Sequence, residues 1–99
     1  MLREIIWSPL AEKDLGNVLE YLSENWNQRV INRFLNKIDI ATNQIAKVSN
    51  QYPIINRNLQ VRKCVVTKQN TLFYREVGKQ IEILRLYDTR QDPKKLKFT

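Results

Sequence analysis

The chain has 99 residues, 42% of them apolar and 27% charged, with a formal net charge of +7, one cysteine and no histidine. This length supports one hydrophobic core and predicts a single domain over residues 1–99. The lone Cys64 excludes an intramolecular disulfide, and the lack of histidine removes the commonest general base and metal ligand, so we expect no metal site and no cofactor. There is no apolar run of transmembrane length and no signal-peptide pattern, which favours a cytoplasmic protein without membrane contact.

The first half of the chain predicts a strand followed by a helical hairpin. Residues 3–8 are partly β-branched or aromatic and predict a strand. Ser8-Pro9 predicts the start of a helix, with Ser8 as the N-cap and the proline at the first helical position. Apolar residues at helical spacing extend this helix over 9–24 and predict a second helix over 28–48. Two amphipathic helices with a short connection should pack as an antiparallel hairpin.

The second half predicts a loop and then three consecutive strands. The loop covers residues 49–58, which are rich in Asn and Gln. The predicted strands are Leu59–Val66, Thr71–Val77 and Gln80–Tyr87, separated by turns short enough for hairpins. The predicted fold class is therefore α+β with the order β-α-α-β-β-β, a helical hairpin on one face of a twisted, mainly antiparallel four-stranded sheet. Residues 94–99 are rich in lysine and predict a flexible basic tail.

The last predicted strand is apolar on both sides. Ile81 and Ile83 share one side, whereas Leu84 and Leu86 do not keep this alternation. Such a strand is either covered on both faces or has one face available to a partner. Because two helices cover only one face, the pattern indicates a binding partner for the other.

All of the excess positive charge lies in the second half of the chain. Residues 1–49 hold six basic and six acidic residues, whereas residues 50–99 hold eleven basic and four acidic residues. This imbalance predicts an acidic partner for the second half, either RNA or DNA or an acidic protein segment. Ordinary solvated side chains on exposed strands are the alternative interpretation.

Several short motifs follow one another in a characteristic order. They are Trp7-Ser8-Pro9, Asp14-Leu15, Tyr21-Leu22, Arg62, Leu72-Phe73-Tyr74-Arg75, Ile81 to Leu86, and Asp88-Thr89-Arg90. Together, from residue 3 to residue 95, they resemble the RelE/ParE family of toxins from bacterial type II toxin–antitoxin systems. The resemblance implies a toxin that inhibits growth and that a cognate antitoxin neutralises.

The family that these motifs resemble has two functional branches. RelE-like members cut mRNA on the ribosome with basic residues and a tyrosine near the C-terminus, whereas ParE-like members poison DNA gyrase. This chain has Thr71 where the RNase branch has an arginine, and no tyrosine follows Arg90. The resemblance therefore favours the ParE-like branch, which implies a gyrase inhibitor in a plasmid-stabilisation system rather than an enzyme.

Two alternatives to the ParE-like interpretation stay open. The first is a metal-independent, ribosome-dependent endoribonuclease in which Arg62 and Arg90 would be catalytic. The second is a basic nucleic-acid-binding domain without toxicity, for which binding should depend steeply on salt.

Seven residues are candidate contacts to the target or to the antitoxin. They are Arg62, Arg75, Arg85, Arg90, Leu84, Leu86 and Tyr87. The alternative is that the arginines form structural ion pairs with Glu76, Glu82 and Asp88. Arg85 lies between two leucines and is expected to need a carboxylate partner, since a charge in an apolar strand is costly alone. Tyr74 and Tyr87 are the phenols nearest these arginines, and core packing is the alternative for both.

Overall fold

Strand β1 (Glu4–Trp7) leads directly into helix α1 (Pro9–Asn25) in the computed structural model, which describes residues 2–98. Ser8 caps this helix as predicted: its side-chain oxygen accepts a hydrogen bond of 3.1 Å from the backbone N–H of Ala11. Pro9 occupies the first turn, where a missing N–H costs nothing. The Ser8 hydroxyl also donates to the carbonyl of Leu84, at 3.0 Å. One residue therefore starts the helix and attaches it to the sheet.

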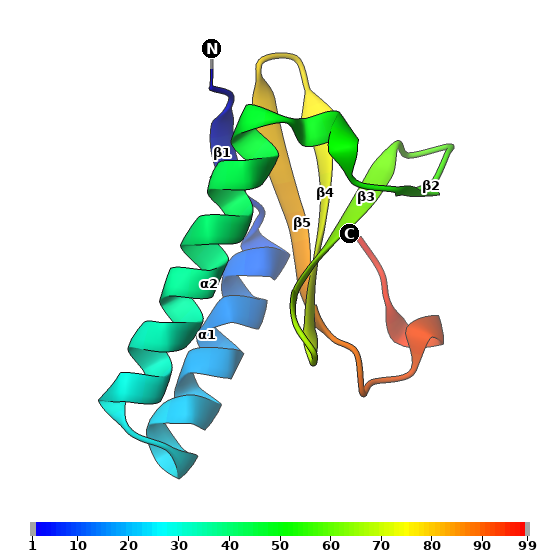
Figure 1. Cartoon of the computed structure of the whole chain (residues 1–99). Coiled ribbons are helices and arrows are strands. Elements are labelled where there is room, and N and C mark those ends of the chain that lie inside the picture. The colour runs from blue at the N-terminus through cyan, green and yellow to red at the C-terminus, as the bar shows by residue number, and fades with distance from the viewer. Residues whose placement is uncertain (1, 99) are drawn as a thin grey trace.

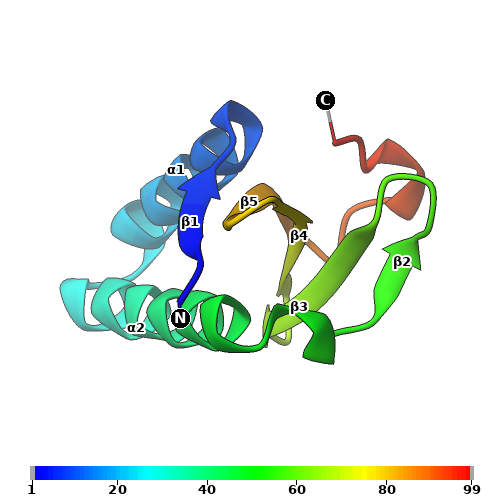
Figure 2. The ribbon, with the colours of Figure 1, turned by 90° about the horizontal axis from the view of Figure 1, so that it is seen from above.

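Helix α2 (Gln28–Lys47) returns beside α1 and completes the helical hairpin. Asn27 caps it by accepting a hydrogen bond of 3.1 Å from the backbone N–H of Val30. The apolar stripe of α2 faces the sheet, and its buried apolar residues are Phe34, Ile38, Ala41, Ile45 and Ala46. Both helices cover the same face of the sheet, as Figure 2 shows.

The sheet has five strands in the order β1-β5-β4-β3-β2. After α2 the strands are β2 (Ile54–Asn56), β3 (Val61–Thr67), β4 (Asn70–Val77) and β5 (Gln80–Asp88). β1 runs parallel to β5, and the other pairs are antiparallel (Figure 1). The predicted α+β class, with a helical hairpin on one face of a mainly antiparallel sheet, is confirmed.

The fifth strand, β2, lies within the segment that the sequence predicted to be a loop. A short 3₁₀ helix, η1 (Ser49–Gln51), precedes it. β2 has three residues and an irregular register against β3. Because so short a segment shows no alternation of apolar and polar residues, its pairing with β3 is decided by the tertiary structure.

A β-bulge explains why β5 is apolar on both faces. Along the β4–β5 pair, Phe73 lies opposite Arg85 and Tyr74 lies opposite Ile83, so Leu84 is one residue in excess. The extra residue reverses the alternation of side chains along the strand. Ile81, Ile83 and Leu86 consequently belong to the core beneath the helices, whereas Leu84 and Tyr87 belong to a second cluster.

The second cluster lies on the outer face of the sheet and is covered by the chain's own C-terminal residues. We call it the outer-face cluster; its buried members are Val61, Phe73, Leu84 and Tyr87. Leu96 and Phe98 pack against it, just after the 3₁₀ helix η2 (Pro93–Lys95). Figure 2 shows this C-terminal segment on the side of the sheet opposite the helices.

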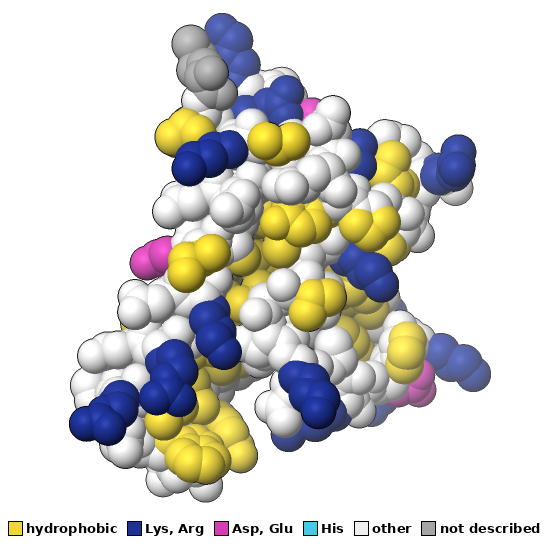
Figure 3. Space-filling view, in the orientation of Figure 1, with side chains coloured by type: hydrophobic (Ala, Val, Ile, Leu, Met, Phe, Trp, Pro, Cys, Tyr) yellow, Lys and Arg dark blue, Asp and Glu magenta, His cyan; other side chains and the backbone are white. Residues whose placement is uncertain are grey.

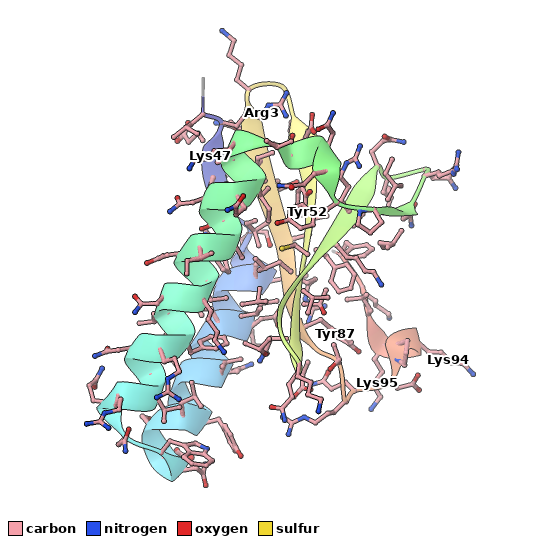
Figure 4. All side chains as sticks on the ribbon, in the orientation of Figure 1. Arg3, Lys47, Tyr52, Tyr87, Lys94 and Lys95 are labelled. Atoms are coloured by element: carbon pink, nitrogen blue, oxygen red, sulfur yellow. The ribbon has the colours of Figure 1, made fainter. Side chains whose placement is uncertain are left out.

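This packing corrects one expectation from the sequence. The second apolar face of β5 does not stay open for a partner, because Leu96 and Phe98 cover it. The segment predicted to be a flexible basic tail contains part of η2 and the cluster contacts Leu96 and Phe98, while Thr99 lies outside the described residues; its flexibility stays a prediction. Lys94 and Lys95 are exposed on η2, away from the helices (Figure 4).

We predict that Ser8→Ala lowers the free energy of unfolding by about 1–2 kcal/mol, because it removes the N-cap of α1 and the hydrogen bond to Leu84. Ser23→Ala is the matched control: the Ser23 hydroxyl is exposed and bonds only to a carbonyl of its own helix. The control should change stability by less than about 0.5 kcal/mol. Chemical denaturation measures both, and equal losses would contradict the double role of Ser8.

Candidate functional site: a basic groove between the hairpin and the sheet

An open groove of about 700 Å³ separates the helical hairpin from one end of the sheet. One wall consists of residues of α1 and α2. The other wall consists of the turn between β3 and β4 and the residues that end and follow β5. Figure 3 shows the groove as a notch between the lower parts of the helices and of the strands, with Lys and Arg side chains on both sides.

The rim of the groove is positively charged. Lys13 comes from α1, Arg33 and Lys37 come from α2, and Arg90 comes from the opposite wall. Arg33 and Lys37 are four residues apart, so they lie on the same face of α2. The groove residues include five basic and two acidic ones, a formal net charge of +3. Both acids, Asp14 and Asp88, are already paired with arginines.

The floor of the groove is apolar. Val18 and Leu22 of α1 and Val30 and Phe34 of α2 line it together with Leu86 of β5. Tyr21 also lines the groove and is 51% exposed. An apolar floor between cationic rims suits a ligand that is itself apolar on one side and acidic at its margins.

Arg85 forms a bidentate ion pair with Asp14 inside the groove wall. Arg85 Nε donates to Asp14 Oδ2 at 2.7 Å, and Nη2 donates to Oδ1 at 3.1 Å. Both side chains are largely buried, with 16% and 15% exposure. The hydrogen bond with Asp14 raises the pKa of Arg85 further above its usual range. The structural ion pair expected for Arg85 is confirmed, and its partner is on α1 rather than on a neighbouring strand.

Arg90 pairs with Asp88 and stays accessible on the rim. Arg90 Nη2 donates to Asp88 Oδ2 at 2.7 Å, and the Arg90 backbone N–H donates to Oδ1 at 2.9 Å. The hydrogen bond from the Arg90 side chain lowers the pKa of Asp88. The Arg90 side chain is nevertheless 60% exposed. Of the four predicted arginines, Arg90 therefore presents its charge most openly to a groove ligand.

Arg62 and Arg75 lie away from the groove. Arg62 Nη1 donates to the backbone carbonyls of Tyr52, at 2.6 Å, and of Asn50, at 3.3 Å, and so fastens η1 to β3. Arg75 Nε donates to Glu82 Oε1 at 2.8 Å. The expected ion pairs with Glu82 and Asp88 are present, whereas Glu76 pairs with Arg3 at 2.9 Å. The four arginines thus do not converge on one site.

The two candidate tyrosines are core residues. Tyr74 is fully buried and donates its hydroxyl to the carbonyl of Ser49, and burial raises its pKa. Tyr87 is 6% exposed and donates its hydroxyl to the Asp92 carbonyl at 2.7 Å. Leu84 and Leu86 are also buried, at 5% and 3% exposure. These residues can shape a binding surface but do not themselves present a large area to a partner.

Sequence reasoning missed the cations of the first half. Lys13, Arg33 and Lys37 belong to a stretch whose net charge is zero, so the charge count gave no reason to select them. The spacing of Lys13, Asn17 and Tyr21, four residues apart on α1, was an available signal that they share one helix face.

Among residues 2–98, no group of three or more His, Cys, Asp or Glu side chains is arranged to hold a metal ion. The described part of the chain likewise contains no helix with the length and apolar character needed to cross a membrane.

Comparison with known proteins identifies the family. The model of the family "ParE toxin of type II toxin-antitoxin system, parDE" matches residues 5–93. The chain belongs to the ParE toxin family. Comparison with the curated proteins gave no match.

Solved structures share the fold of this ParE family member at low sequence identity. A chain of the chromosomal ParDE TA system from P. aeruginosa is 19% identical, with a TM-score of 0.73, and the match covers 88% of this chain and 96% of that one. The conserved hypothetical protein HP0894 from Helicobacter pylori is 16% identical, with a TM-score of 0.59 and coverage of 92% and 98%. A copper-bound mutant toxin from Helicobacter pylori is 16% identical, with a TM-score of 0.58 and coverage of 91% and 97%.

The pairing of Asp88 with Arg90 predicts a specific pH dependence. Because the pKa of Asp88 is lower in the folded state than in the unfolded chain, protonation favours unfolding, and stability falls as the pH drops below about 4. We predict that Asp88→Asn makes the free energy of unfolding less dependent on pH in this range. Arg90→Gln should flatten the profile in the same way, since it removes the cause of the shift. Unfolding followed by circular dichroism at several pH values measures this dependence. If stability falls as steeply with pH in both variants as in the unmodified protein, the Asp88–Arg90 pair is not its cause.

Proposed function

We propose that this chain is the growth-inhibiting component of a toxin–antitoxin pair, that a cognate antitoxin neutralises it by filling the basic groove, and that its target is DNA gyrase. The observation that carries the antitoxin proposal is the groove itself, which has an apolar floor, cations without a carboxylate partner on its helical wall, and the exposed Arg90 on the opposite wall. The family indicates a type II toxin–antitoxin system. The apolar and basic character of the groove indicates which side chains a partner must present.

An acidic amphipathic helix matches the groove best. Its apolar side chains, at spacings of three and four residues, would cover the floor formed by Val18, Leu22 and Phe34. Its carboxylates would face Lys13 and Lys37 on the rims. Apolar contacts would supply most of the affinity, and the charge pairs would mainly raise the association rate and exclude basic competitors.

The positions of the arginines favour binding over RNA cleavage. Arg62 lies opposite Tyr74 on β4, whereas Asp88, the partner of Arg90, lies opposite Asn70. Four residues of a strand span about 13 Å, so the two arginines lie toward different ends of the sheet. RNA cleavage without a metal needs an acid, a base and charge stabilisation at one phosphate. This separation supports the proposal of a target-binding toxin rather than an endoribonuclease built on Arg62 and Arg90.

The antitoxin proposal predicts that reversing one rim charge weakens the complex. Lys37→Glu should lower the affinity for the proposed cognate antitoxin by about three- to tenfold, mainly through slower association at low salt. Lys79→Glu is the matched control, because Lys79 is exposed at the β4–β5 turn, outside the groove. Surface plasmon resonance at two salt concentrations measures the effect. Equal losses for both variants would contradict the groove as the binding site.

The gyrase proposal predicts inhibition of DNA supercoiling by the purified chain, reversed when the antitoxin is added. In a translating extract the same protein should leave mRNA intact. Transcripts cut during translation, with cutting lost in Arg90→Gln, would instead establish the endoribonuclease. Tight binding to naked DNA or RNA without effect on either assay would point to a nucleic-acid-binding domain.

A further inference from the structure

The C-terminal residues form a strap across the outer face of the sheet. We define the strap as residues 93–98. Phe98 packs against Phe73, with ring centroids 5.7 Å apart, and Leu96 contacts the same outer-face cluster. Leu96 and Phe98 are only partly buried, whereas the cluster beneath them is buried. If the strap moved away, this apolar surface would become accessible to water or to another protein.

Few polar contacts hold the strap in place. At its start, the backbone N–H groups of Lys94 and Lys95 donate to the side-chain Oδ1 and the carbonyl of Asp92, both at 2.9 Å. Within the strap, the N–H of Leu96 donates to the Pro93 carbonyl at 3.2 Å. The contact nearest its end is a hydrogen bond of 2.6 Å from Arg85 Nη1 to the carbonyl of Lys97. The strap is not a strand of the sheet, so it lacks a ladder of backbone hydrogen bonds to its support. Segments with so few bonds are the first to open locally.

Arg85 connects the strap to the groove. Its Nε and Nη2 bind Asp14, which lines the groove, while its Nη1 binds the strap carbonyl. The side chain can reach both layers because β1 ends at Trp7, opposite Ile83, and does not pair with the part of β5 that holds Arg85. One guanidinium therefore joins the helical layer, the edge of the sheet and the strap.

We propose that Arg85 couples occupation of the groove to opening of the strap. A carboxylate of a groove ligand competes with Asp14 for Arg85, draws the guanidinium toward the groove and removes its hydrogen bond to the Lys97 carbonyl. The loosened strap then uncovers the outer-face cluster. The trigger, which is the binding of an acidic ligand in the groove, depends on the partner proposed above. The stabilisation of the strap by Arg85 depends only on contacts within this chain. A ligand shifts such an equilibrium only through its different affinity for the two states.

Hydrogen exchange measured by mass spectrometry tests the hold of Arg85 on the strap. In Arg85→Gln, the amides of Lys95 and Leu96 should exchange roughly tenfold faster relative to amides in the centre of α2, because a charge-assisted hydrogen bond is lost. Arg75→Gln is the matched control, since it breaks an arginine–carboxylate pair of the same sheet that does not involve the strap. The control should exchange at the rate of the unmodified protein.

A second variant keeps this test decisive. Phe98→Ala removes the apolar anchor of the strap without changing Arg85, and its exchange rate shows how a released strap behaves. The α2 amides serve as an internal reference that separates strap opening from global unfolding. If Phe98→Ala speeds strap exchange while Arg85→Gln leaves it unchanged, the proposal is overturned.

The trigger is tested with poly-L-glutamate as the acidic probe. Added to the unmodified chain, it should speed strap exchange several-fold, and Lys37→Glu should reduce this response because the groove binds the probe less tightly. Binding by calorimetry without any change at the strap would refute the coupling and leave the proposed groove partner intact. Failure of the probe to bind would count against the acidic partner and, with it, against the trigger.

Discussion

The contacts between the start of α1 and the uncovered edge of β5 organise the whole molecule. β1 pairs with β5 only as far as Ile83, so the backbone of the following residues lacks a strand on that side. Ser8 supplies a donor to the Leu84 carbonyl, and Asp14 accepts a hydrogen bond of 3.1 Å from the Leu86 N–H. Since buried backbone groups must be paired, these two side chains replace a missing strand and set the position of the hairpin on the sheet. The groove exists because the hairpin extends beyond that attachment point.

The bulge at Leu84 gives β5 two apolar faces, and a different part of the chain buries each of them. Without the extra residue, the alternation along β5 would place Leu86 on the face opposite Ile83. With it, the helices bury one set of side chains and the C-terminal strap buries the other. Arg85 lies on the part of β5 beyond the end of β1, where it binds α1 on one side and the strap on the other. The inserted residue therefore underlies the packing of both faces, and the short β1 leaves open the edge on which the proposed coupling depends.

The electrostatic character of the groove depends on which charges are already paired. Its two carboxylates, Asp14 and Asp88, are held by Arg85 and Arg90, whereas Lys13 and Lys37 have no carboxylate partner among the described residues. The cations come from both halves of the sequence, so the surface that a partner meets differs from the distribution along the chain. Excess positive charge still indicates an acidic partner, but the charge has to be counted on the surface of the folded protein and not along the sequence.

Local chemistry in the sequence determined the two helices with their caps at Ser8 and Asn27, the three long strands, the α+β class and the need of Arg85 for a carboxylate. These follow from periodicity, capping and the cost of a buried charge, which act over a few residues. Only the tertiary structure decided that Asp14 is that carboxylate, 71 residues away, that β2 pairs with β3, and that Lys13 and Arg90 face one groove. It also decided that Leu96 and Phe98 shelter the second face of β5. These features depend on contacts between segments that are distant in the sequence, and such contacts produce no local periodicity from which they could be predicted.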